Sequence, residues 1–317
     1  MNLAFGPIPS RRLGNSLGIN NIPPKSCSYS CVYCQVGATD TPQIEPRIFY
    51  PPEAIFEAVD TRLREVRKTG GSVDYLTFVP DGEPTLDINL GNSIERLKAL
   101  DIPVAVISNA SLLWREEVRA ALGTADWVSL KVDSVDDGIW HRINRPHEEL
   151  PLERVLDGIR SFVGEFSGDL VSETMLLGGI NDSEDSVSAI AAFLQEVGIN
   201  RTYLAIPTRP TAESGLIMAD ESALNRAFQI LTGAVPRVEY LIGYEGDEFG
   251  SGGDAREDLL GITAVHPMRV SAIERLLQRT GQDWSLVQAM IDSGELTEVT
   301  YQGKRYYLRH LSRRQDA

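Results

Sequence analysis

Short apolar runs alternate with amphipathic segments along most of the chain. Runs rich in β-branched residues, typical of buried strands, occupy residues 17–22, 75–79, 104–108, 127–132, 170–176 and 201–206. Between most of them apolar residues recur at helical spacing, which predicts helices at 52–68, 90–100, 113–122, 152–166, 185–197 and 220–231. This strand–helix alternation predicts an α/β fold with a parallel sheet, although periodicity alone does not separate an open sheet from an incomplete barrel.

The alternation ends in a polar, glycine-rich stretch at residues 244–258, which predicts a linker. Beyond it, the spacing indicates two short helices at 269–280 and 284–293. Two strands at 296–301 and 304–308 then flank the turn pair Gln302-Gly303. Two helices followed by a hairpin are typical of a winged-helix-like module. We therefore predict a core domain over residues 1–243, a linker over 244–258 and a small C-terminal module over 259–317.

The charge of the chain is unevenly distributed. Of a net charge of −15, residues 51–255 carry most, with 35 acidic and 17 basic residues. Such acidity argues against broad nonspecific affinity for nucleic acid in this region. Near the end, Lys304-Arg305, Arg309-His310 and Arg313-Arg314 form a basic edge that could contact RNA phosphate. The alternative is an interaction or lid module with a solvated basic tail.

Two further features bear on location. No run approaches the roughly 18–20 apolar residues that a membrane helix needs. The first residues lack the cationic start and apolar stretch of a signal peptide. We therefore predict a cytoplasmic protein with no membrane partner.

All three cysteines of the chain lie in one short segment, Cys27-Ser-Tyr-Ser-Cys31-Val-Tyr-Cys34. An odd, clustered set is a poor disulfide framework, and soft thiolates favour iron–sulfur clusters, zinc or copper(I). A [4Fe–4S] cluster ordinarily has four protein thiolates, so three would leave one iron open to another ligand. The alternative is a zinc site that adds one of the four histidines, none of which is close in sequence to the cysteines.

The C-x3-C-x2-C spacing, in a loop after the first predicted strand and with an aromatic residue before the last cysteine, resembles the radical S-adenosylmethionine (SAM) superfamily. The resemblance implies a [4Fe–4S] cluster whose open iron binds the amino and carboxylate groups of SAM. It also implies reductive cleavage of SAM to a 5′-deoxyadenosyl radical, which abstracts hydrogen from a substrate. An external one-electron donor such as flavodoxin or ferredoxin is then required.

Four stretches are similar to a bacterial and archaeal radical SAM group related to wyosine-base synthases: residues 6–14, 31–37, 143–146 and 259–267. Those relatives act on a guanine-derived base in tRNA and use a second cluster. This chain has no further cysteine for a second cluster, so we expect a shared scaffold rather than the wyosine reaction. The expected scaffold is a partial (β/α)6 barrel of parallel strands that carries the winged-helix-like module.

Three elements of this chain resemble the parts of the superfamily that contact SAM. Gly82 and Glu83 resemble its Gly-Gly-Glu motif, which meets the SAM amino group, but Asp81 stands where the family often has glycine. Asn109 resembles the asparagine of its Thr-Asn-Gly element and is expected to hydrogen-bond SAM. Tyr33 is expected to meet adenine through its backbone. Turn formation and packing are the alternative roles of these residues.

Charged residues interrupt the apolar runs and are further candidates for catalysis. Lys131 and Asp133 are two apart on a predicted strand and should share a face, where a buried charge is costly unless paired or bound to a ligand. We expect Lys131 to meet the SAM carboxylate and Asp133 the ribose or the substrate. An internal ion pair is the alternative. Glu173 is expected in the barrel interior and Arg209 at its mouth.

Three functions fit these observations. The favoured one is a radical SAM enzyme with an unidentified substrate. The second is base modification of RNA, including tRNA, by the same chemistry, with RNA contacted through the basic C-terminus. The third is a non-catalytic iron–sulfur redox sensor with a nucleic-acid-binding winged helix, which needs no SAM pocket.

Overall fold

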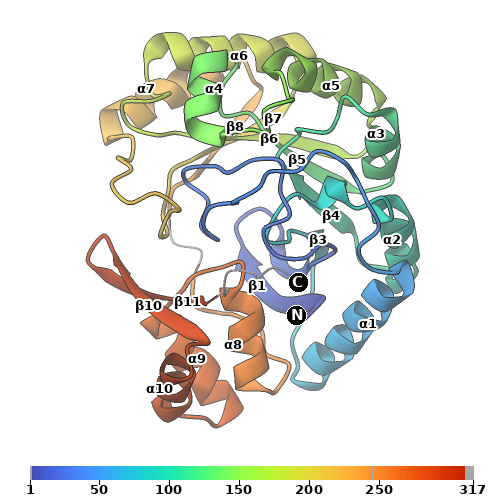
Figure 1. Ribbon diagram of the computed structural model, residues 1–317, viewed down its shortest axis with the longest axis vertical. Helices are drawn as coiled ribbons and strands as arrows, with labels where there is room; N and C mark the ends of the chain where they lie inside the picture. The colour runs from blue at the N-terminus through green and yellow to red at the C-terminus, as the bar shows by residue number, and fades with distance from the viewer. Residues whose placement is uncertain (1, 244–245, 311–317) are drawn as a thin grey trace.

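The structure, a computed structural model, describes residues 2–243 and 246–310. Over these residues, eight strands form one curved sheet in the order of the sequence, from β1 to β8. The pair β1–β2 is antiparallel and each later pair is parallel. Figure 1 shows the strands as an inner arc, with the helices that connect them along its outer side. The predicted α/β fold with a partial barrel of parallel strands is confirmed.

The strands of the large sheet are β1 (Ala4–Ser10), β2 (Gly14–Ile19), β3 (Tyr75–Phe78), β4 (Val104–Ser108), β5 (Trp127–Lys131), β6 (Asp169–Met175), β7 (Arg201–Ala205) and β8 (Arg237–Leu241). The helices are α1 (Pro52–Lys68), α2 (Leu90–Leu97), α3 (Glu116–Leu122), α4 (Asp137–Asn144), α5 (Leu152–Glu165), α6 (Glu184–Val197) and α7 (Glu221–Thr232). Two short 3-10 helices lie at Pro84–Leu86 and Lys98–Leu100.

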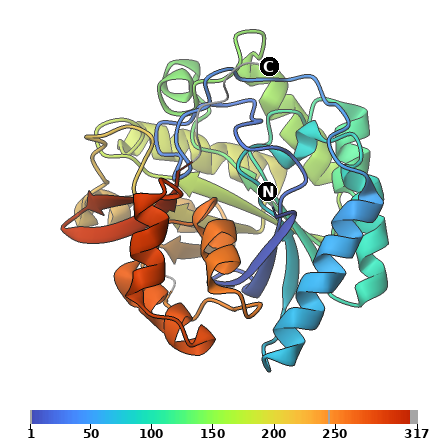
Figure 2. The ribbon, with the colours of Figure 1, turned by 60° about the horizontal axis from the view of Figure 1, so that its bottom comes forward.

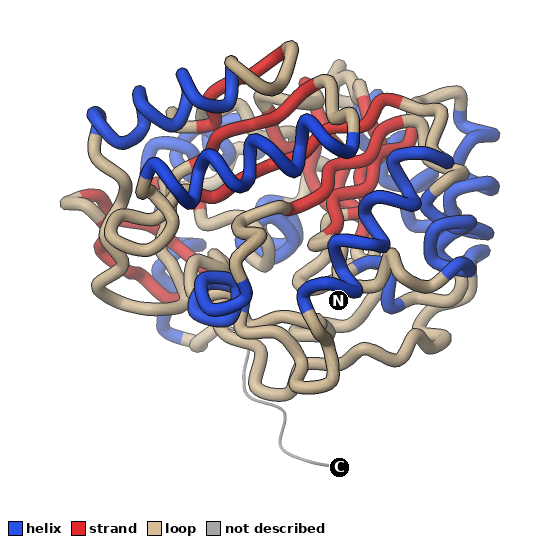
Figure 3. Tube along the Cα trace, turned by 90° about the horizontal axis from the view of Figure 1, so that it is seen from above, coloured by secondary structure: helices blue, strands red, loops and turns tan. Residues whose placement is uncertain are grey.

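Figure 3 shows these helices beside the strands from above, and their apolar stripes bury the outer face of the sheet. In α1, Ile55, Val59, Leu63 and Val66 recur at helical spacing and are each 2% exposed or less. Burial of each such side chain contributes roughly 1.5–3 kcal/mol to the hydrophobic term. The helical period of this segment therefore determines which face of α1 packs against the sheet.

The concave side of the sheet has its own apolar cluster, built from Leu13, Ala105, Trp127, Val171, Tyr203, Ala205 and Leu241. Leu13 comes from the turn between β1 and β2 and packs among residues of the parallel strands. The β1–β2 hairpin thus contributes a side chain to the barrel interior as well as an edge strand.

The C-terminal residues form a second, smaller unit. Its elements are α8 (Ala255–Thr263), β9 (Met268–Arg269), α9 (Val270–Thr280), α10 (Trp284–Asp292), β10 (Leu296–Tyr301) and β11 (Lys304–Arg309). The last two strands pair as the predicted hairpin, and β11 pairs with β9. We call residues 255–310 the C-terminal module. It packs through α8 against β1, on one edge of the sheet (Figures 1 and 2).

The six predicted parallel strands correspond to β2 through β7, and the sheet adds β1 and β8 at its two edges. Helix α4 was not predicted, and α8 begins inside the stretch predicted as a linker. Arg313-Arg314 and the start of that stretch lie outside the described residues. The division into domains stays a prediction.

No helix among the described residues is long and apolar enough to cross a lipid bilayer.

Candidate active site

The three cysteines lie in the long segment between β2 and α1, which crosses the carboxyl ends of the parallel strands. Cys27, Cys31 and Cys34 are free thiols and line one cavity of about 290 Å³. Residues at or beyond the ends of β3, β4, β5 and β7 line the same cavity. This end of the sheet is where parallel α/β folds bind their ligands.

Gly82 brings the cysteine segment against the end of β3. The Glu83 backbone N–H donates to the Ser26 carbonyl at 2.9 Å. A Cβ at position 82 would lie 2.0 Å from that carbonyl oxygen, and the Gly82 φ of +151° is one that L side chains rarely adopt. Asp81, where the family often has glycine, forms an ion pair with Lys25 at 3.4 Å. The cysteine segment can therefore approach β3 this closely only because residue 82 is glycine.

Glu83 is 1% exposed and joins the ends of β3 and β4. Its Oε1 accepts hydrogen bonds from the Thr85 N–H at 3.1 Å, the Thr85 hydroxyl at 2.6 Å and the Ser108 hydroxyl at 2.8 Å. Its Oε2 accepts from the Asn109 N–H at 2.7 Å. Burial raises the pKa of Glu83, and these hydrogen bonds oppose that shift.

Asn109 lines the cavity, and its side chain contacts the cysteine segment. Its Nδ2 donates to the Ser28 hydroxyl at 2.9 Å and lies 3.6 Å from Cys27 Sγ. Its Oδ1 accepts from the Ser111 N–H at 3.0 Å, which fixes the orientation of the amide. A hydrogen bond from Asn109, the residue after β4, thus reaches the sulfur of Cys27.

Lys131 and Asp133, predicted to share a face, have different surroundings because β5 ends at Lys131 and the strand period ends with it. Lys131 lines the cavity, whereas Asp133 is absent from its lining and is 3% exposed. Asp133 accepts hydrogen bonds from the Tyr33 hydroxyl and, at 2.8 Å, from the Met175 N–H. It therefore fixes Tyr33, whose ring lines the cavity 5.0 Å from Lys131 Nζ.

A buried ion-pair group lies inside the barrel. Glu173 accepts from Lys131 Nζ at 2.9 Å and is also paired with Arg12 of the β1–β2 turn. Burial acts to raise the pKa of Glu173, but the charges of Arg12, Lys131 and Arg11 lower it to about 2. The internal ion pair of Lys131 is therefore with Glu173 on the neighbouring strand.

Arg209 lies in the loop between β7 and α7 and lines the cavity, at the mouth as predicted. Its Nη1 donates to Gln35 Oε1 at 2.8 Å, and Gln35 Nε2 donates to the Val265 carbonyl at 3.0 Å. Burial, and then the charge of Arg209, lower the pKa of neighbouring His266 well below its ordinary value. Gln35 thereby links the cysteine segment, the β7–α7 loop and the C-terminal module.

The thiols are suited to a group that binds thiolates. Burial raises the pKa of Cys31 to about 12 and the pKa of Cys27 well above its ordinary value. A positively charged iron centre offsets such a cost because it binds the deprotonated sulfur. Asparagine N–H groups directed at Cys27 and Cys31 also favour the thiolate. The zinc alternative needs a histidine beside the cysteines, and none of the described histidines lines this cavity.

Four residues of the site were not among the predicted site residues: Arg12, Gln35 and Val265 line the cavity, and Asn144 contacts Cys31 from outside it. Each belongs to one of the four stretches that are similar to the wyosine-related group. The resemblance to the wyosine-related group therefore pointed to the right stretches of sequence. No rule of spacing or periodicity shows which residue within each stretch belongs to the site.

Comparison with known proteins agrees with this geometry. The family model of the radical SAM superfamily matches residues 21–191. The UPF0026 protein of Methanocaldococcus jannaschii is 45% identical over 316 residues, which are 99% of this chain and 98% of that protein.

Two solved structures share the fold. TYW1 with a lysine–pyruvate adduct bound has a TM-score of 0.56 at 15% identity, over 71% of this chain and 76% of its own. A radical SAM methyltransferase from Sphaerobacter thermophilus has a TM-score of 0.52 at 18% identity, over 71% of this chain and 66% of its own. The chain is therefore an enzyme of the radical SAM superfamily, whose members use a [4Fe–4S] cluster and SAM.

Proposed function

We propose that this chain cleaves SAM reductively and uses the resulting radical to abstract hydrogen from a substrate bound in the same cavity. The observation that carries the proposal is the convergence of Cys27, Cys31 and Cys34 with Glu83 and Asn109 on one cavity. A cluster held by Cys27, Cys31 and Cys34 would supply one-electron reduction of SAM, in which a sulfur–carbon bond would break to give methionine and a 5′-deoxyadenosyl radical that would take a hydrogen atom from the substrate.

The residues around the cavity are proposed to bind and orient SAM. The thiolates of Cys27, Cys31 and Cys34 hold three irons. Glu83 Oε2 receives one hydrogen bond and so keeps a lone pair for the SAM ammonium. Asn109 is held beside Cys27 and is proposed to hydrogen-bond SAM next to the ammonium group.

The opposite side of the cavity is proposed to receive the substrate. Glu173 and Arg209 are proposed to face the substrate, whereas Lys131, paired with Glu173, is proposed to meet the SAM carboxylate. Tyr33 lies between the cysteines and this side, with its ring fixed by Asp133.

The wyosine-type reaction is not part of the proposal. TYW1 has been solved with a lysine–pyruvate adduct, and Lys131 is the one lysine that lines the cavity in the described part of this chain. Burial acts to lower the pKa of Lys131, but Glu173 and Asp133 raise it above its ordinary value. A protonated amine has no lone pair with which to attack a carbonyl carbon.

RNA modification finds limited support in the basic edge. Arg305 pairs with Glu298, and Arg309 donates to the Leu260 carbonyl, so a phosphate would have to replace these contacts. The test is tRNA binding as a function of salt, with Lys304→Ala and Arg305→Ala as variants. Equal tRNA affinity of the wild type and both variants would show that the basic edge does not bind RNA.

We propose a flavodoxin or ferredoxin as the electron donor and the cytoplasm as the location, because reduced thiolates persist there. A ferredoxin or flavodoxin reduction system should therefore replace dithionite in the assay with the same product.

The proposal is tested by anaerobic reconstitution followed by reduction with dithionite in the presence of SAM. We expect about four irons per chain, and equal amounts of methionine and 5′-deoxyadenosine. Replacement of each cysteine in turn by alanine should abolish the product, whereas Thr41→Ala, an exposed residue of the same segment, should not. Product formation that survives the cysteine substitutions would refute the proposal.

A further inference from the structure

Residues 143–147, at the end of α4 and just after it, form backbone hydrogen bonds with the cysteine segment. The Val32 N–H donates to the Ile143 carbonyl at 2.9 Å, and the Ser30 N–H donates to the Asn144 carbonyl at 3.0 Å. The last carbonyls of a helix have no partner within the helix, and here the cysteine segment supplies their donors. Residues 143–146 thus cap α4 and hold the segment on both sides of Cys31.

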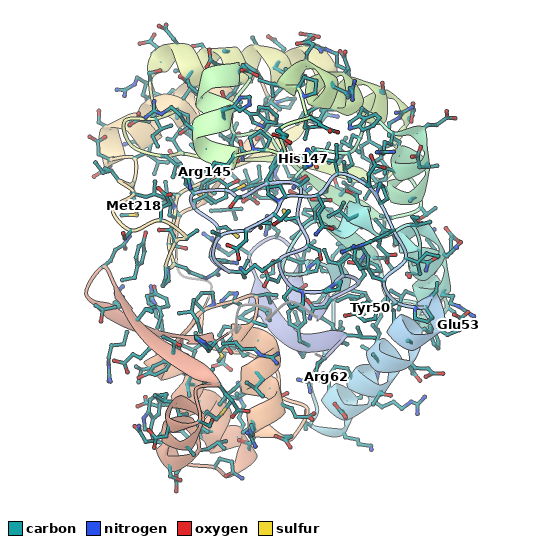
Figure 4. The ribbon with its side chains drawn as sticks, in the orientation of Figure 1. Tyr50, Glu53, Arg62, Arg145, His147 and Met218 are labelled. Carbon is teal, nitrogen blue, oxygen red and sulfur yellow. The ribbon has the colours of Figure 1, made fainter. Side chains whose placement is uncertain are left out.

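The chain then turns back to the same segment. Arg145 has a left-handed φ of +43°, which reverses the chain direction at the helix end. The His147 N–H then donates to the Ser28 carbonyl at 2.9 Å. Figure 4 shows Arg145 and His147 where the chain leaves α4 and passes this segment.

Asn144 itself is directed at a cysteine sulfur. It is 2% exposed, and its Nδ2 lies 3.4 Å from Cys31 Sγ and 2.8 Å from Asp133 Oδ2. Both neighbours are acceptors, so the amide nitrogen rather than its oxygen must face them. One N–H therefore points to the sulfur and the other to the carboxylate.

The acceptor behind Asn144 is itself held in place. Asp133 Oδ1 accepts from the Met175 N–H at 2.8 Å, and the Asn181 side chain donates to the Asp133 carbonyl at 2.9 Å. Because the carboxylate cannot turn, it fixes the amide plane of Asn144. The N–H directed at Cys31 is thus preorganised by β5, β6 and the loop that follows β6.

We propose that Asn144 sets the reduction potential of the cluster through its N–H···S hydrogen bond to Cys31, as a positioning residue for electron transfer. The inference rests on the proposed function, which assigns the cluster to Cys27, Cys31 and Cys34. Hydrogen bonds to cluster sulfurs and net charge nearby set such potentials. The donor stabilises the more negative reduced cluster more than the oxidised one, so it raises the potential of the one-electron couple.

Two substitutions at position 144 separate the effect of the donor from that of charge. Asn144→Leu removes both N–H groups at similar size, and Asn144→Asp replaces the amide by a carboxylate of nearly the same shape. We expect the reduction potential to fall in the order wild type, Asn144→Leu, Asn144→Asp. At a fixed solution potential near the wild-type midpoint, the reduced fraction of Asn144→Leu should fall three- to tenfold.

The measurement is an anaerobic redox titration in which electron paramagnetic resonance follows the reduced cluster. Asn20→Leu is the matched control because it removes an equally buried amide, 2% exposed, that donates to the Asn2 carbonyl at 3.0 Å and is outside the hydrogen-bond network of Asn144. Its potential should equal that of the wild type. Iron content and thermal unfolding are recorded for each variant.

A wild-type measurement keeps the inference testable if the Asn144 variants fail to fold. Electron–nuclear double resonance of the reduced cluster after exchange into D₂O should show a strongly coupled exchangeable proton, and a ¹⁵N coupling in protein labelled at asparagine. Absence of both signals, or an Asn144→Leu potential equal to that of the wild type or Asn20→Leu, would overturn the role of Asn144. A wild-type protein that binds no [4Fe–4S] cluster would instead overturn the proposed function.

Discussion

At the scale of single residues, the polar groups of the cavity are held mostly by one another. Glu83 is fixed by donors from Thr85, Ser108 and Asn109, and Glu173 by Lys131 and Arg12. Polar groups fixed before a ligand arrives cost no reorganisation when it binds. The folded chain therefore already holds these polar side chains in fixed positions before a ligand binds.

The close approach at Gly82 gives the first prediction. Gly82→Ala places a Cβ 2.0 Å from the Ser26 carbonyl oxygen, which must then move together with the cysteine segment. We expect a loss of at least about 2 kcal/mol in the free energy of unfolding and reduced iron content after reconstitution. Gly70→Ala is the control, because Gly70 also has a positive φ, of +77°, but a Cβ there would meet no atom within 4 Å. Equal losses in the two variants would show that the approach to Ser26 does not matter.

The buried ion-pair group gives the second prediction. Glu173→Gln leaves Arg12 and Lys131 without their carboxylate and should cost about 3 kcal/mol at pH 7. Because the folded-state pKa of Glu173 is lowered to about 2, its contribution is full above its unfolded pKa and is lost as pH falls towards 2. The difference between wild type and variant should therefore shrink below about pH 4.5.

Denaturant unfolding of both proteins at several pH values measures this difference. Glu53→Gln removes an exposed carboxylate paired with Arg96 and should behave as the wild type throughout. A Glu173→Gln difference that stays constant from pH 7 to pH 3 would contradict the assignment.

At the scale of elements, the hairpin of the C-terminal module holds the loop that carries Arg209. The Tyr301 hydroxyl donates to the Pro207 carbonyl at 3.2 Å, and the Tyr306 hydroxyl donates to the Thr208 carbonyl at 3.1 Å. Farther along the loop, Gln302 lies 2.9 Å from Met218 Sδ, which Figure 4 shows facing the hairpin. The hairpin therefore borders the cavity mouth rather than extending away from it.

Removal of these hydroxyls gives the third prediction. Tyr301→Phe and Tyr306→Phe should each cost about 1 kcal/mol and should speed amide hydrogen exchange in residues 206–218. Tyr307→Phe is the matched control, since its hydroxyl bonds to Glu298 within the hairpin. Exchange in the loop that is unchanged in the first two variants would show that the hairpin does not restrain it.

The elements also show what the sequence could predict. The helical stripe of α1 and the apolar runs of the central strands are strong periodic signals, and they predict these elements correctly. β1 contains two prolines and pairs at an edge of the sheet, so propensity argues against it. Helix α4 is short, and the cysteine segment caps its end. Contacts between distant segments, as at Asn144 and Gln35, leave no periodic trace.

At the scale of the whole molecule, the module covers an edge of the sheet that would otherwise be exposed. Phe5 of β1 packs with Ala264 and Val265, next to the end of α8. Arg62 of α1 donates to the Gly6 carbonyl at 2.8 Å and pairs with buried Asp258 of α8. Covering an edge strand in this way blocks its pairing with other chains.

This shared interface gives the fourth prediction. The barrel and the module should unfold together in calorimetry, as one cooperative transition. Phe5→Ala, which leaves a cavity between them, should lower stability by about 3–5 kcal/mol. Ile217→Ala is the control, because that side chain is 69% exposed. Two separate transitions in the wild type would contradict the prediction.

The bonds made by Gln35 have a consequence for chimeric enzymes. One side chain, next in sequence to Cys34, accepts from Arg209 and donates to the Val265 carbonyl. Because every residue has a backbone carbonyl, a C-terminal module transplanted from a relative can keep this bond whatever residue stands at position 265, provided that its backbone follows the same path. Recombination between members of this group should therefore succeed when the end of α8 has the same length, and lower cluster occupancy when an insertion or deletion there moves that carbonyl.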